Sequence, residues 1–100
     1  MRALVYRKGT VLLESIDDEN VQFVEVQTIV IHEQAKYLYC CRLNILFFDA
    51  HRNAFRVDRS ESVSVIRITD LFYRWPQVVH HQGDRYFVML HNADDVWSLH

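Results

Sequence analysis

The feature that most constrains this sequence is a regular alternation of side chains between residues 37 and 48. In the segment YLYCCRLNILFF, every second position is apolar, namely Tyr37, Tyr39, Cys41, Leu43, Ile45 and Phe47. Successive side chains of a β-strand point to opposite faces, so a period of two is typical of a strand with one face in the core. The chain is therefore expected to be built around a β-sheet.

Other segments have the same character. Val21–His32 is rich in β-branched residues and has no helical spacing, and its apolar phase changes between Phe23 and Val24. A β-bulge, or burial on both faces, would explain that change. We expect further strands at 54–58 and 60–68, a first hairpin over 4–14 around Lys8-Gly9, and a last hairpin of 77–81 and 85–91.

Polar turns separate these segments at a spacing of roughly ten residues, which favours a small sandwich or barrel. Thr69-Asp70 could cap one short helical turn near 70–75, ended by Pro76. The prediction is an all-β fold, a small partly open barrel of five to seven antiparallel strands with that single helical turn. Two glycines and one proline are few for so many turns, so other residues must supply the turn conformations.

Length and composition bound the class of protein. One hundred residues, 50% hydrophobic and 24% charged, predict a single β-barrel domain over 1–100. The net charge of -2 lacks the positive excess that binding to nucleic-acid phosphates normally requires. Arginine greatly outnumbers lysine, and arginine is common at protein interfaces.

The cysteines and the N-terminus indicate a compartment. Cys40 and Cys41 are neighbours within an apolar segment, so their side chains point apart and cannot easily form a disulfide. The start MRALVYRKGT has no secretory pattern, and no apolar segment approaches the length of about 20 residues that spans a membrane. We expect an intracellular protein, nuclear or cytoplasmic, that is not secreted and binds no membrane.

Six histidines raise the question of a metal site. His80 and His81 are adjacent on an expected strand and so point to opposite faces, and no pair of residues has the spacing of zinc ligands. His32, His51 and His91 could converge only through the tertiary fold. We expect no metal and no cofactor.

No segment resembles a catalytic motif. Ser60, Ser62 and Ser64 enter a strand rather than a strained turn, and the cysteines lie where a thiol is usually buried with a raised pKa. Gly9 and Gly83 are isolated, whereas phosphate loops are rich in glycine. We expect no enzyme; a hydrolase or redox enzyme that uses His51 or the cysteines is the remaining catalytic alternative.

The segment from Phe55 to His81 is the strongest candidate for binding, because it mixes arginines with large aromatic residues, the types that dominate interface hot spots. The competing interpretation is that Leu71, Phe72 and Trp75 close one end of the barrel while the arginines face solvent. The predicted binding residues are Arg56, Arg59, Arg67, Tyr73, Arg74 and Trp75.

Two sequence elements in residues 21–81 resemble known domains. Asp49, His51, Ala54, Phe55 and Val57 stand at an "FxxHxxAYxV" element, and Asp70, Leu71 and Pro76 at a "VxxxDLxxxxPL" element. Together they resemble the C-terminal β-domain of uncharacterised animal proteins of candidate transposon origin. They are also distantly similar to bromo-adjacent homology domains, barrels of chromatin proteins that bind histone tails and other proteins. The resemblance implies an SH3-like or bromo-adjacent homology-like barrel and an association with chromatin.

Three functions remain open at this point. The first is a protein-interaction module that binds a peptide or partner protein through an arginine and aromatic rim or an exposed strand edge, with homodimerisation by strand pairing as a related form. The second is nucleic-acid or chromatin binding through the segment from Arg42 to Arg85, which carries seven arginines and five acidic residues. The third is the catalytic alternative named above.

Overall fold

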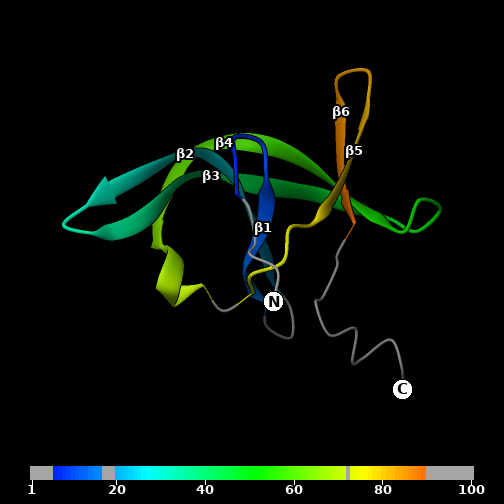
Figure 1. Cartoon of the computed structure of the whole chain (residues 1–100). Helices are drawn as coiled ribbons and strands as arrows, with labels where there is room; N and C mark the ends of the chain where they lie inside the picture. The colour runs from blue at the N-terminus through cyan, green and yellow to red at the C-terminus, as the bar shows by residue number, and fades with distance from the viewer. Residues whose placement is uncertain (1–5, 17–19, 72, 90–100) are drawn as a thin grey trace.

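A computed structural model describes residues 6–16, 20–71 and 73–89 of the chain. Six antiparallel strands form one curled sheet, a half-barrel (Figure 1). The strands are β1 (Val11–Ile16), β2 (Val21–His32), β3 (Ala35–Asp49), β4 (Ala54–Arg67), β5 (Val78–Gln82) and β6 (Arg85–Met89), and a 3-10 helix η1 spans Ile68–Asp70. The all-β prediction, with its partly open barrel of five to seven strands, is confirmed.

The strand order in the sheet is β1-β2-β3-β4-β6-β5. The first four strands follow each other as a meander, and η1 and the segment after it then cross to the β1 side before β5 begins. There the backbone N–H of Gln77 donates to the carbonyl of Val11 over 2.7 Å. The β5–β6 hairpin returns to the sheet through β6, which pairs with β4 at only three positions, Phe55 to Val57. As a result, this hairpin projects away from the arch made by β2, β3 and β4 (Figure 1).

Bulges explain why the sheet curls. The register shifts once between β1 and β2, once between β2 and β3, and twice between β3 and β4. Each extra residue bends its strand and increases the local right-handed twist. The largest irregularity lies in β4, where residues 60–62 fall between the pairs Leu43–Arg59 and Cys41–Val63. The hydroxyl of Ser60 donates to the carbonyl of Arg42 over 2.7 Å and so satisfies a backbone group there.

The middle of the sheet is buried on both faces. One cluster contains Val11, Leu13 and Phe23, and the other contains Leu12 and Val24. Because neighbours along a strand point in opposite directions, the two clusters cover opposite faces. The first cluster joins β1 to β6 across the curl, and the second is closed by Leu71 after η1. The phase change expected in β2 therefore reflects burial on both faces, together with a bulge between Val26 and Thr28.

Two expected features differ in position. The predicted strands 54–58 and 60–68 are one continuous strand, β4, because a bulge rather than a turn accommodates the polar residues 60–62. The helical turn expected near 70–75 is η1, at Ile68–Asp70, and the chain is already extended at Leu71. Both hairpin turns at 33–34 and 83–84 lie where the sequence predicted turns. In the expected N-terminal hairpin the turn at Lys8-Gly9 is present, but Tyr6 and Arg7 before it are not part of a strand. Residues 4 and 5 of that hairpin and the end of the chain lie outside the described residues.

Candidate functional site

The structure separates the six predicted binding residues into different places. Arg56 and Arg59 both lie in the first half of β4. Arg56 pairs with Phe87 and Arg59 pairs with Leu43, and the side chains of these two pairs point to opposite faces of the sheet. Arg67 ends β4, far along the strand. The other three, Tyr73, Arg74 and Trp75, lie in the connection that leads to β5. The predicted residues do not form one continuous patch.

The connection before β5 has a structural role. Tyr73 packs against the first core cluster, and the Nε of Arg74 donates to the carbonyl of Leu71 over 3.3 Å. The hydroxyl of Tyr6 donates to the carbonyl of Arg74 over 2.8 Å. Trp75 remains 46% exposed, so among these three it alone offers a large apolar surface to solvent.

Arg59, whose side chain is itself exposed, takes part in a network around the buried carboxylate of Glu25 that links β2, β4 and β6. Its Nε and Nη2 donate to the two carboxylate oxygens of Glu25 over 2.8 and 3.2 Å. The hydroxyl of Tyr86 donates to the same carboxylate over 2.8 Å, and the side-chain amide of Gln27 over 3.0 Å. The guanidinium carbon of Arg59 also lies 5.6 Å from the centre of the Tyr86 ring.

The network sets the charge state of its members. Burial alone would raise the pKa of the Glu25 carboxyl, but hydrogen bonds from its neighbours and the charge of Arg59 outweigh burial and hold that pKa below its ordinary value. Burial raises the pKa of Tyr86, and the hydrogen bond to Glu25 raises it further, so its hydroxyl stays a donor. A shallow pocket of about 360 Å³ adjoins the network and is lined by Lys8, Gly9, Glu25, Gln27 and Arg59.

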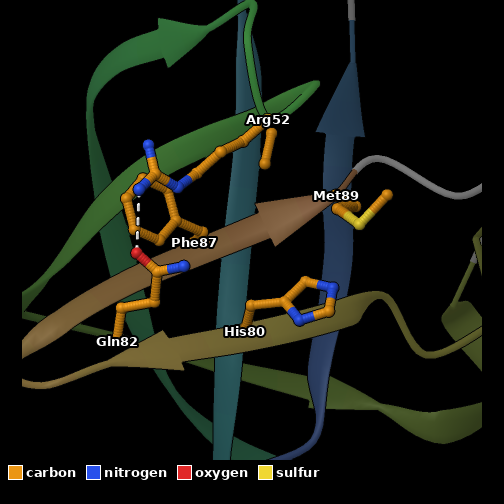
Figure 2. A pocket seen from close by; sticks show the side chains of 6 residues that line it. Arg52, His80, Gln82, Phe87 and Met89 are labelled. Carbon is orange, nitrogen blue, oxygen red and sulfur yellow. Dashed lines mark hydrogen bonds between the residues drawn. The ribbon is translucent and has the colours of Figure 1, made fainter.

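A second pocket, of about 220 Å³, lies where the β5–β6 hairpin meets β4 (Figure 2). We call it the hairpin pocket. The guanidinium carbon of Arg52 sits 4.8 Å from the centre of the Phe87 ring, a cation–π geometry. Arg52 also donates to Asp49 and to Gln82, over 2.8 Å in each case. The lining residues are Arg52, Ala54, His80, Gln82, Phe87 and Met89.

Local geometry holds Arg52 in this position. The carboxylate of Asp49 accepts from the backbone N–H groups of His51 and Arg52, and Asn53 adopts a positive φ, so the turn after β3 is fixed. The side-chain hydrogen bond from Arg52 is the main cause that lowers the pKa of Asp49. Arg52 is therefore paired with Asp49, hydrogen-bonded to Gln82 and stacked on Phe87.

Arg56 borders the same ring. Its guanidinium carbon lies 5.9 Å from the centre of Phe87. Its Nε is buried, and no described group accepts a hydrogen bond from it. A buried donor without a partner is uncommon in native proteins and calls for an explanation. The Phe87 ring therefore has the guanidinium groups of both Arg52 and Arg56 beside it, and of these two only Arg52 lines the hairpin pocket.

The residues that could act as nucleophiles have structural roles. Burial raises the pKa of the Cys40 thiol to about 11, and the nearby carboxylate of Glu14 adds to this effect. The Sγ of Cys41 donates to the carbonyl of Ser60 over 3.0 Å. The hydroxyl of Ser64 donates to Glu14, which is also paired with Arg42 over 3.2 Å. Both cysteines are free thiols.

Within residues 6–16, 20–71 and 73–89, no three His, Cys, Asp or Glu side chains gather closely enough to hold a metal ion. In the same part of the chain, no helix has the length and apolar character needed to cross a membrane. No protein-family model, curated protein or solved structure matches this chain.

Sequence reasoning missed most of the hairpin pocket. The pattern predicts a hairpin strand that contains Phe87, but it gives no sign that Arg52, more than thirty residues earlier, contacts it. One signal was present: YFVML, which follows Arg85, is apolar at consecutive positions, so Tyr86 and Val88 point to one face while Phe87 and Met89 point to the other. A core covers only one face of a short hairpin, so the second apolar face indicates a further contact or a pocket on that side.

Proposed function

We propose that this protein is a non-catalytic interaction module that binds an extended segment of a partner protein at the hairpin pocket. The observation that carries the proposal is the position of this pocket beside β5. Within the described residues, β5 pairs only with β6, so its other edge is open to a further strand. An extended peptide that adds to such an edge gains backbone hydrogen bonds, and a neighbouring pocket selects its side chains.

The chemistry of the pocket favours a particular ligand. Ala54, Phe87 and Met89 supply apolar surface for one buried side chain. Arg56, which takes part in none of the ion pairs among the described residues, lies beside the Phe87 ring and favours a carboxylate on the same ligand. The partner segment is thus an extended peptide with an apolar anchor residue next to an acidic one.

Nucleic-acid or chromatin binding is the alternative, and the contacts of the arginines support it less well. Three arginines of the middle of the chain are paired with carboxylates: Arg42 with Glu14, Arg52 with Asp49, and Arg59 with Glu25. Each pair reduces the positive charge that a phosphate backbone could use. A role as an enzyme has no more support, because the thiol of Cys41 and the hydroxyls of Ser60 and Ser64 hold backbone or carboxylate groups.

The test is selection from a displayed library of random linear peptides, followed by affinity measurement on the selected peptides. We expect enriched sequences with an apolar residue next to Asp or Glu. Substitution Arg52→Ala should weaken their binding about tenfold or more, as for a hot-spot arginine. The matched control Arg67→Ala removes an exposed arginine at the far end of β4 and should leave affinity within about twofold.

Two further readouts separate the alternatives. Bound peptide should slow amide hydrogen exchange in β5, because strand addition uses its backbone groups. Binding to a single-stranded oligonucleotide that weakens steeply with salt would favour the nucleic-acid alternative. Absence of any enriched peptide, or equal affinity for wild type and Arg52→Ala, would refute the hairpin pocket as a peptide site.

A further inference from the structure

A second exposed edge lies at the other side of the sheet, in the last part of β2. The turn at residues 7–10 covers β2 as far as Val26, whose N–H donates to the carbonyl of Thr10 over 2.8 Å. Beyond Val26, residues 28–32 pair with β3 on one side. On the other side, the described part of the chain provides no strand.

Beyond the bulge between Val26 and Thr28, this edge carries neither of the two commonest protective features, charged side chains and proline. Native edge strands are protected by charged side chains, proline, bulges or short length. The sequence from Thr28 to His32 is TIVIH, which contains no Lys, Arg, Asp, Glu or Pro. The side chains are also accessible: Ile29 is 40% exposed, Val30 44% and Ile31 68%.

The sheet face next to the edge is apolar as well. In the register of β2, β3 and β4, Thr28 stands beside Tyr39 and Val65, and directly paired residues point to the same face. Tyr39 and Val65 are exposed, as is Val63 two positions before Val65 on β4. Val30 lies on this face, whereas Ile29 and Ile31 lie on the other, so the edge exposes apolar side chains on both faces of the sheet. Grouped exposed apolar side chains of this kind mark an association site.

We propose that this β2 edge pairs with the same edge of a second copy of the chain, in an antiparallel dimer with two-fold symmetry. With the axis at Val30, Ile29 of each copy faces Ile31 of the other, and Thr28 faces His32. Glu33 faces Gln27, so no two like charges stand opposite each other. A self-complementary strand is what a symmetric interface requires, because each residue must fit its counterpart in the same patch.

The charges on the neighbouring strands are compatible with this pairing. Lys36 lies next to Ile31 on β3 and is the cation nearest the edge in the register. In the dimer the two copies of Lys36 are three strand spacings apart, about 14 Å. That distance exceeds the Debye length of about 8 Å at physiological ionic strength, so their repulsion is largely screened. An acidic or basic peptide, by contrast, would find no opposite charge within residues 28–32.

The experiment is multi-angle light scattering over a range of concentrations. We expect the wild-type chain to reach twice the 12.0 kDa of one copy, independently of salt. Val30→Lys should be monomeric, because a lysine at the centre of the interface would face its own copy. The matched control is Val78→Lys on β5, since Val78 is 45% exposed and Val30 44%. The control variant should remain dimeric.

A second variant guards against misfolding of the first. Ile31→Lys changes the most exposed of the three residues, and circular dichroism checks that both variants fold. A wild-type chain that stays monomeric at high micromolar concentration would overturn the proposal, as would a monomeric Val78→Lys beside a dimeric Val30→Lys. Open-ended growth into large assemblies would also overturn it. Peptide binding at the hairpin pocket should persist in Val30→Lys, so the two proposals fail separately.

Discussion

At the scale of single residues, Glu25 is the group on which most contacts converge. Its carboxylate is buried in a sheet that is otherwise apolar at this point, yet it accepts hydrogen bonds from Arg59, Tyr86 and Gln27. A buried charge is tolerated when it is paired and fully hydrogen-bonded, and it becomes destabilising when one partner is removed.

The first prediction concerns the hydroxyl of Tyr86. Tyr86→Phe removes one donor to a buried carboxylate and keeps the ring, so we expect the free energy of unfolding to fall by about 1.5–3 kcal/mol. Equilibrium unfolding in urea measures this loss of stability. Tyr39→Phe is the control, because Tyr39 is exposed, and it should change stability by less than about 0.5 kcal/mol. Equal losses in the two variants would contradict the network.

The second prediction is the pH dependence of stability that Glu25 causes. Its pKa in the folded chain lies below the ordinary value of 4.5, so its stabilising effect is complete above 4.5 and is lost as the pH falls through the folded pKa. Glu25→Gln lacks this titration. The difference in unfolding free energy between the wild type and Glu25→Gln should therefore be constant above pH 4.5 and shrink steadily as the pH is lowered below it. A difference in unfolding free energy between the two proteins that stays constant over the whole pH range would contradict this prediction.

At the scale of elements, the turns carry strain that the sequence pattern did not reveal. The two-residue turn between β2 and β3 consists of Glu33 and Gln34, with φ of 50° and 69°. Such hairpin turns require positive φ at both positions and normally use Asn-Gly. The turn between β5 and β6 instead places Gly83, with φ of 63°, at its first position.

The third prediction compares these two turns. Gln34→Gly removes the side chain that strains the backbone in the left-handed region. We expect this change to raise the free energy of unfolding by about 0.5–1 kcal/mol. Gly83→Ala places a side chain in the same backbone region and should lower stability by about 1 kcal/mol. Thermal unfolding of both variants measures the two opposite shifts. Shifts of the same sign would contradict the interpretation.

Element by element, the sequence predicted what depends on local pattern. The limits of β2 and the strand that became β3 followed from alternation and flanking polar residues, and the β5–β6 hairpin followed from its glycine turn. The continuity of β4 could not be predicted, because Ser60 and Ser62 resemble a turn and only the carbonyl of Arg42, on another strand, makes them a bulge. The hairpin pocket joins Arg52 to Phe87 across 35 residues, and no local pattern encodes such a contact.

At the scale of the whole molecule, two hydrophobic clusters share the same strands. Leu12 and Leu13 are adjacent and both buried, but they belong to different clusters on opposite faces. If the strands that carry one cluster unfold, the other cluster loses its packing as well. The half-barrel is therefore expected to unfold as one cooperative unit.

The fourth prediction tests this cooperativity. Leu12→Ala and Leu13→Ala should each lower the free energy of unfolding by about 2–5 kcal/mol. In both variants, the transitions followed by circular dichroism and by tryptophan fluorescence should coincide. Leu46→Ala, at a half-exposed bulge position, is the control and should have little effect. Separate transitions in either leucine variant would show that the two faces melt independently.

The short contact between β6 and β4 has a consequence for affinity. Only three residue pairs join the β5–β6 hairpin to β4, while the hairpin pocket needs Arg52 on one side and Phe87 on the other. The peptide proposed for this pocket would bind only molecules in which the hairpin is docked on β4, and its apparent dissociation constant would rise as that fraction falls. Any partner that clamps the hairpin to the sheet, even from outside the pocket, would thereby act as a positive effector of peptide binding.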